Sequence, residues 1–169
     1  MLDAKKVILT LADNTTNTIT DSSRLSTEED YSAAIYSKED LIINGNGTLN
    51  VNAGYRNGIK STDDCIIVSG TLNITSTEDG IIGKDLCGVV AGDININAGS
   101  DGIKSTYDTD TTKGNVIIEG GNITIKASND GIQAENILVI NDGAINIKTN
   151  NGAADTTQTH IAVSYTHLT

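Results

Sequence analysis

Asp101-Gly102-Ile103-Lys104-Ser105 decides the fold, because the chain repeats the first three positions of this segment at nearly constant intervals. The copies are Asn57-Gly58-Ile59, Asp79-Gly80-Ile81, Asp130-Gly131-Ile132 and a degenerate Asn151-Gly152-Ala153. Their glycines follow one another at steps of 22, 22, 29 and 21 residues. A period of this length is typical of solenoids, in which each coil stacks on the previous one.

Each repeat contains the pattern of three short strands. A second glycine follows the first and precedes an alternating segment, such as Leu72-Asn73-Ile74 or Ile94-Asn95-Ile96, and a further apolar position lies between the two glycines, as at Ile67. Alternation places aliphatic side chains on one face of a strand and polar side chains on the other. We therefore expect aliphatic columns inside and Asn and Thr columns outside. The sequence predicts an all-β protein, a right-handed parallel β-helix of about six coils of roughly 22 residues. A β-sandwich is the alternative, but its strands do not repeat so closely at this period.

Two further features fit stacked coils. The 29-residue step contains one interruption, residues 107–113, which we expect to protrude as a loop while the coils above and below stay in register. Cys65 and Cys87 are 22 residues apart, so they should stack in adjacent coils and point inward. Parallel Cβ directions disfavour an unstrained disulfide, and we expect two buried free thiols.

Composition and charge exclude several classes of protein. The 169 residues include no Pro, Phe or Trp, and the formal net charge is −11. This charge argues against nucleic acid as a partner, because binding to phosphates requires a basic face. No apolar stretch approaches the roughly 20 residues of a membrane helix, so we expect no membrane span. An acidic protein of this kind fits a setting outside the cell or at its surface, and we expect a monomer.

The two ends show no capping element, although a solenoid needs one to cover its open strand edges. We therefore expect residues 1–162 to be a single β-helix domain that is truncated at both ends. Residues 163–169 match the translation of a transposon sequencing adapter, and we interpret them as a non-native tail that pairs with nothing in the repeat.

The segment from Ala34 to Gly45, together with the repeats Asp101-Gly102-Ile103-Lys104-Ser105 and Asp130-Gly131-Ile132-Gln133-Ala134, resembles a known family. Its members are secreted bacterial carbohydrate-binding proteins with a polysaccharide-lyase-like right-handed parallel β-helix. The resemblance covers roughly residues 4–152. It implies bound calcium and binding of plant cell-wall polysaccharide, namely cellulose and acidic pectic polymers such as polygalacturonate, without established cleavage.

Two groups of acidic residues are candidates for calcium. Asp79, Asp101 and Asp130 occupy one position of the repeat, so their carboxylates would stack about 5 Å apart and repel one another unless a cation bridges them. Alternatively, aspartate stands before glycine simply because it suits a corner. Asp108 and Asp110 have the spacing of alternating oxygen ligands, with Glu119 downstream, although a solvated polar loop would look the same. Asp63, Asp64 and Asp85 form a third acidic group, which we interpret as residues that favour a turn and not as a site.

Lys60 and Lys104 follow the repeated isoleucine and should point outward in one strip with Tyr36 and Gln133, where they could bind a sugar chain or simply face solvent. We add Tyr107 in the loop and Arg56 at a corner as candidate carbohydrate ligands.

The favoured hypothesis is a non-catalytic polysaccharide-binding module that uses calcium. The first alternative is a calcium-dependent pectate-lyase-like enzyme, with Arg56 as the conceivable base beside the aspartate column. The second is a structural stalk or adhesin segment, in which the helix serves as a spacer.

Overall fold

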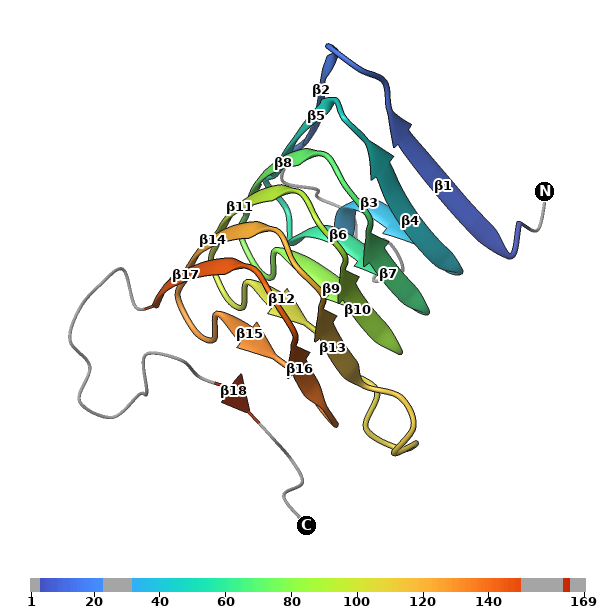
Figure 1. Ribbon diagram of the computed structural model, residues 1–169, viewed down its shortest axis with the longest axis vertical. Coiled ribbons are helices and arrows are strands. Elements are labelled where there is room, and N and C mark those ends of the chain that lie inside the picture. Colours follow the sequence, from blue (N-terminus) through green and yellow to red (C-terminus); the bar gives the residue numbers. More distant parts are fainter. Residues whose placement is uncertain (1–3, 23–31, 150–162, 165–169) are drawn as a thin grey trace.

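The computed structural model describes residues 4–22, 32–149 and 163–164. They form three parallel six-stranded sheets that make up the three sides of a solenoid (Figure 1). We call these sheets A, B and C. Each coil contributes one strand to each of them, in that order along the chain. The predicted all-β class and parallel β-helix are confirmed, with six coils in the described part of the chain. No helix that could span a membrane occurs among the described residues.

The strands of sheet A begin each coil, and those of sheet B follow after a corner. Sheet A consists of β1 (Lys6–Leu11), β4 (Asp40–Gly45), β7 (Asp64–Ile67), β10 (Leu86–Val89), β13 (Asn115–Ile118) and β16 (Leu138–Ile140). Sheet B consists of β2 (Thr16–Asp21), β5 (Thr48–Ala53), β8 (Thr71–Ser76), β11 (Asp93–Ala98), β14 (Asn122–Ala127) and β17 (Ala144–Thr149).

Sheet C closes each coil with its shortest strands. They are β3 (Ala33–Ser37), β6 (Asn57–Ser61), β9 (Ile81–Gly83), β12 (Ile103–Lys104), β15 (Ile132–Gln133) and β18 (Val163–Ser164). The pairing of β15 with β18 contradicts the expectation that residues 163–169 pair with nothing, because Val163 lies opposite Ile132 in a parallel register. Residues 150–162 and 165–169 lie outside the described residues, and the division at residue 162 stays a prediction.

The core is a set of aliphatic columns that run through the coils. Ile59, Ile81 and Ile103 stack on sheet C and are fully buried. Sheet A stacks Cys65 on Cys87, and both are buried free thiols, as expected. Identical side chains in neighbouring coils meet at the strand spacing of about 4.8 Å, which fills the interior without aromatic rings.

The loop of residues 107–113 leaves this register intact. Leu86 pairs with Asn115 and Cys87 with Val116, although the insertion separates them in sequence. The loop extends from the stack between β12 and β13 (Figure 1), as expected.

Sheets A and B differ on their outer faces. Sheet B carries the expected polar columns, in which Asn73 donates to Asn50 and accepts from Asn95 at 2.9 and 3.0 Å. Sheet A instead carries an outward aliphatic column of Ile8, Ile42, Ile66, Gly88, Ile117 and Val139. The expectation of outer Asn and Thr columns is therefore wrong for sheet A. Consecutive isoleucines such as Ile66-Ile67 fill both faces of one strand, and alternation cannot reveal this.

Candidate functional site

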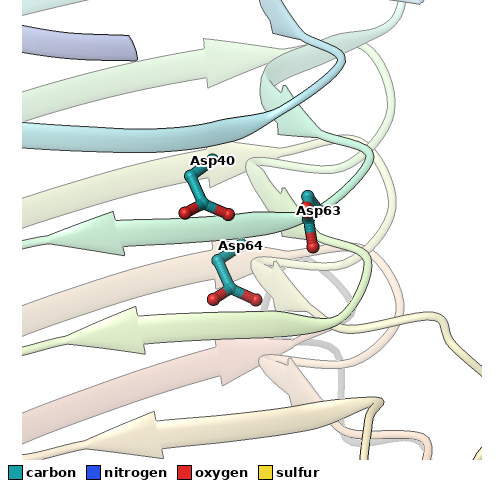
Figure 2. Close-up of side chains that lie close together, drawn as sticks. All are labelled: Asp40, Asp63 and Asp64. Carbon is teal, nitrogen blue, oxygen red and sulfur yellow. The ribbon is translucent and has the colours of Figure 1, made fainter. Parts of the chain in front are cut away.

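A cluster of carboxylates, the acidic corner, lies where sheet C turns into sheet A. It consists of Asp40, Asp63 and Asp64, and one carboxylate oxygen from each lies within 4.8 Å of the others. Figure 2 shows Asp40 and Asp64 at the starts of neighbouring strands, with Asp63 beside them at the turn. Asp40 and Asp64 begin β4 and β7, immediately before the paired residues Leu41 and Cys65.

Buried serine hydroxyl groups shape this corner. The hydroxyl of Ser37 donates to the carbonyl oxygen of Glu39 at 2.6 Å and accepts from its N–H at 3.2 Å. In the next coil, the Ser61 hydroxyl also donates to Glu39 O, at 2.8 Å, and accepts from the N–H of Asp63 at 3.1 Å. These bonds tie the turns of two neighbouring coils together and fix the backbone that carries Asp40, Asp63 and Asp64.

The acidic corner is electrostatically unfavourable as it stands. Burial raises the pKa of Asp64, and the negative charges of Asp40, Asp63 and Asp85 raise it further. Burial also raises the pKa of Asp63, assisted by a hydrogen bond with Asp85 and by the charges of Asp85 and Asp40. Like charges at this separation disfavour the ionised forms, so this corner attracts cations.

Of the three carboxylates, only Asp40 has an ion pair among the described residues, and a second lysine pairs with the neighbouring Asp85. Lys6 lies 3.4 Å from Asp40 Oδ2, and Lys113 lies 2.5 Å from Asp85 Oδ2. Asp63 and Asp64 have no ion pair with a lysine or arginine among the described residues. A hard cation such as calcium binds carboxylate oxygens in flexible geometry, so the residues present fit calcium. Asp40, Asp63 and Asp64 would hold it through their carboxylate oxygens.

The sequence points to this corner only weakly. We interpreted Asp63 and Asp64 as turn chemistry, and Asp40 was not among the candidates. The signal that could have revealed the cluster is the 24-residue step from Asp40 to Asp64, which equals the step between the paired residues Leu41 and Cys65.

The aspartate column predicted from the repeat is present, but the carboxylate oxygens of Asp79 and Asp101 already have partners. The Oδ1 atoms of Asn57, Asp79 and Asp101 each accept the N–H of the next residue in the column, ending at Asp130, at 3.0 Å. Lys104 Nζ lies 2.7 Å from Asp101 Oδ2 and 3.9 Å from Asp79 Oδ2. A lysine ammonium thus sits at the position where a bridging calcium was expected.

The lysine and the aspartates of this column shift one another's pKa. Burial lowers the pKa of Lys104, but its hydrogen bond to Asp101 and the charges of Asp79, Asp101 and Asp130 outweigh burial, so the pKa is raised. Burial raises the pKa of Asp130, and the charge of Asp101 raises it further. The column is therefore a structural ion network, and calcium binding to Asp79, Asp101 and Asp130 stays a prediction.

The carboxylates of the protruding loop do not converge. Asp110 Oδ1 accepts from the N–H of Thr112 at 2.9 Å and from its hydroxyl at 2.7 Å, and these bonds lower the pKa of Asp110. Asp108 is exposed. Glu119 lies beyond the far end of β13, where it accepts from Asn141, so it does not complete a ligand set with the loop. Calcium binding by Asp108 and Asp110 stays a prediction.

The expected outward strip on sheet C exists, since Tyr36, Lys60, Ile82, Lys104 and Gln133 share one register position. Its ammonium groups already have partners within the protein. Lys60 donates to the Ser32 hydroxyl at 3.0 Å, and burial lowers the pKa of Lys60. The strip therefore offers fewer free cations to a ligand than its sequence suggests.

Tyr107 and Arg56 lie apart from each other. The ammonium groups of Lys84 and Lys113 each lie 4.8 Å from the Tyr107 ring centroid, and Lys113 also pairs with Asp85. Arg56 lies at the corner between sheets B and C, 5.3 Å from the Tyr55 ring centroid and 3.7 Å from Glu78. Tyr107 is thus linked through Lys113 to Asp85, and Arg56 lies at a different corner.

Known proteins agree with this architecture. A protein of Acetivibrio thermocellus described as carbohydrate-binding domain-containing is 39% identical over 75 residues, which are 42% of this chain and 26% of the relative. The solved structure of the polysaccharide lyase-like protein from C. thermocellum, a gadolinium derivative, has a TM-score of 0.81 and 34% identity. That match covers 86% of this chain and 60% of the solved chain, so the chain spans only part of both relatives.

The family resemblance noted from the repeats is confirmed at the level of the whole sequence. The sequence model of one family matches residues 1–167, and by this match the chain belongs to the family of carbohydrate-binding domain-containing proteins.

Proposed function

We propose that this chain is a non-catalytic polysaccharide-binding module that acts outside the cell or at its surface. In this proposal, calcium at the acidic corner helps it to hold acidic pectic polymers such as polygalacturonate. Family membership supports polysaccharide binding. The observation that supports the calcium-assisted mode is the convergence of three carboxylates at Asp40, Asp63 and Asp64.

The charge of the molecule makes a cation necessary for an acidic ligand. A protein with a net charge of −11 and a polyuronate repel each other. Bound calcium supplies positive charge and further coordination positions, so that protein and sugar carboxylates can share one ion. The chain itself contributes Asp40, Asp63 and Asp64 as oxygen donors.

The lyase alternative has one observation in its favour, the lowered pKa of Lys60, since a lysine with a lowered pKa is a better base. However, the charged neighbours of Lys60 are Asp79, Arg56, Glu78 and Lys84, and none of them belongs to the acidic corner. Lys113, which does lie near the acidic corner, has a raised pKa through its hydrogen bond to Asp85 and is a poor base. We therefore favour binding without cleavage.

The test is affinity electrophoresis in gels that contain polygalacturonate, with calcium or with a chelator. We expect calcium to retard the wild-type protein and the chelator to abolish most of that retardation. Asp63→Asn combined with Asp64→Asn should reduce the calcium-dependent affinity about tenfold or more, because two of three converging oxygen donors lose their charge. The matched control is Asp93→Asn combined with Asp142→Asn, which removes the same charge from exposed residues elsewhere.

A third variant, Asp108→Asn combined with Asp110→Asn, tests the loop as the calcium position. Loss of binding in this variant alone would move the calcium site from the acidic corner to the loop. Equal affinity of the wild-type protein with and without chelator would overturn the calcium mechanism. Release of unsaturated uronides from polygalacturonate, followed by ultraviolet absorbance, would overturn the non-catalytic assignment.

A further inference from the structure

The outer face of sheet A carries an apolar patch that the proposed function does not use. It consists of the outward aliphatic column from Ile8 to Val139, together with Leu86 on one side of it and Val68 and Val90 on the other. These flanking residues lie two positions from the column along their strands, so they share its face. Ile8 is 58% exposed and Val90 is 45% exposed, and the other aliphatic side chains of the patch are partly exposed.

The size of this face sets the kind of contact it can make. Sheet A has six strands. At a strand spacing of about 4.8 Å and about five residues per strand, its outer face covers roughly 500 Å². Exposed apolar patches of this size on a soluble protein mark contacts with another macromolecule. Two such faces packed together bury roughly 1,000 Å², which is the lower limit of a specific interface and favours a weak, reversible one.

The shape of the column is complementary to itself. Gly88 leaves a gap between the side chains of Ile66 and Ile117, its partners in the neighbouring strands. A two-fold axis that runs parallel to the strands, between β7 and β10, reverses the order of the coils in a second copy. It places Ile66 of each copy opposite Gly88 of the other, so that each gap receives one isoleucine, and it places Ile42 opposite Ile117. An axis along the solenoid would instead place Gly88 against Gly88 and leave both gaps empty.

The charges beside the column suit the same arrangement. Facing carboxylates would repel each other across a contact between two acidic copies. With the axis between β7 and β10, the carboxylates of both flanks meet uncharged residues, in the pairs Asp40 with Asn115, Asp64 with Leu86, and Glu119 with Asn44. Asp40 and Asp64 begin their strands, so they lie on the rim of the contact and not at its centre.

We infer that two copies of this chain associate through the outer faces of sheet A, with their solenoid axes antiparallel. The contact uses the same patch on both copies, so it closes at a dimer and does not propagate into a filament. This inference is independent of the proposed function, and it departs from the monomer expected from the sequence. The dimer carries two copies of every binding surface, which raises its avidity for a long polymer.

Sedimentation velocity over a range of protein concentrations measures the association. We expect a reversible monomer–dimer equilibrium that strengthens with ionic strength, because salt screens the repulsion between two chains of net charge −11. Ile66→Thr combined with Ile117→Thr should weaken the dimer about tenfold or more, since it removes apolar surface from the centre of the patch. The matched control is Asn52→Thr combined with Asn97→Thr, which introduces the same residue at exposed positions of sheet B and should change the dissociation constant less than twofold.

Gly88→Ala separates association from folding. A Cβ at this position would meet its nearest atom, Ile66 Cγ1, at 3.5 Å, so the strand accepts it without strain. The added methyl group occupies the gap that receives Ile66 of the second copy. The variant should therefore dimerise severalfold more weakly, while its thermal unfolding midpoint stays the same or rises.

Cysteine cross-linking tests the orientation of the two copies. A mixture of the variants Ile42→Cys and Ile117→Cys should form a disulfide-linked dimer on mild oxidation, because these positions face each other across the axis. Neither variant alone should cross-link, since equal positions lie about three coil spacings, or about 14 Å, apart in the dimer, which is beyond disulfide reach. The native Cys65 and Cys87 are buried and do not compete.

Three outcomes would overturn the inference. The first is a protein that stays monomeric at every concentration. The second is wild-type dimerisation in both sheet A variants, which would point to stacking of the solenoids end to end. The third is cross-linking of the Ile42→Cys variant with itself, which would show a parallel arrangement. None of these outcomes bears on polysaccharide binding, so the proposed function would stand.

Discussion

Lys104 occupies the place in the aspartate column that the sequence suggested for calcium. Its ammonium lies near carboxylate oxygens of two coils, Asp79 and Asp101, and so offsets the repulsion that identical repeats create. At the acidic corner no lysine takes this position for Asp63 and Asp64 in the described part of the chain. The repulsion between stacked carboxylates is thus offset by a lysine in the aspartate column, whereas Asp63 and Asp64 at the acidic corner have no such partner among the described residues.

The uncompensated charge at the acidic corner predicts that the stability of the fold depends on pH. The pKa of Asp64 is raised in the folded protein, by burial and by neighbouring carboxylates, above the unfolded value of about 3.9. Its ionisation therefore destabilises the fold above the folded pKa, and this penalty disappears as the pH falls towards the unfolded value. In chelator at pH 7.5, Asp64→Asn should raise the thermal unfolding midpoint by on the order of a few degrees, and this gain should shrink near pH 4. Thermal unfolding followed by circular dichroism measures both values.

Asp93→Asn serves as the control for this measurement, since Asp93 is exposed on sheet B. A pH-independent effect of Asp64→Asn, or a loss of stability at pH 7.5, would contradict the electrostatic account of the corner.

At the scale of the strands, Gly102 and Gly88 have opposite roles. A Cβ added to Gly102 would lie 2.5 Å from both the carbonyl oxygen of Gly131 and Ile125 Cγ2. A Cβ added to Gly88 would lie 3.5 Å or more from Ile66, which is ordinary contact on the outer face of sheet A. The first glycine is needed for close stacking of the coils, and the second is not.

We therefore predict effects of opposite sign. Gly102→Ala should lower the free energy of unfolding by about 1–3 kcal/mol or more, because backbone and core must shift. Gly88→Ala should raise it by about 0.5–1 kcal/mol, the usual gain of alanine over glycine within a strand. Denaturant unfolding of both variants measures the difference, and a neutral Gly102→Ala would show that the coils are not packed as closely as described.

The sequence predicts the elements better than it predicts the site. Repeated spacing places Cys65 on Cys87 and Ile81 under Ile103, because one period fixes every column. The outer column of sheet A was missed, since adjacent isoleucines leave no alternation to read. The contribution of Asp40 to the acidic corner was missed, because Asp40 belongs to a coil whose 24-residue step differs from the main period. The partners of Lys104 also depend on side-chain reach across coils, which spacing alone does not give.

At the scale of the whole molecule, the net charge of −11 predicts an unusual salt dependence. In chelator, the residual affinity for polygalacturonate should rise with ionic strength, because salt screens the repulsion between two polyanions. In calcium the affinity should fall with salt. Isothermal titration at low and at physiological ionic strength measures both.

Salt that weakens polygalacturonate binding in chelator would contradict this prediction. It would indicate that cations of the sheet C strip, Lys60 and Lys104, dominate the encounter with the polymer despite their internal partners.

The one-coil step that aligns the columns also gives the molecule a simple way to change over evolutionary time. Each coil pairs only with the coils directly above and below it. An in-frame duplication of a single 22-residue unit would therefore add one strand to each sheet while preserving every existing register. The surface offered to a long polymer would then grow with the number of units, so that its extent is set by gene length and not by redesign of any residue.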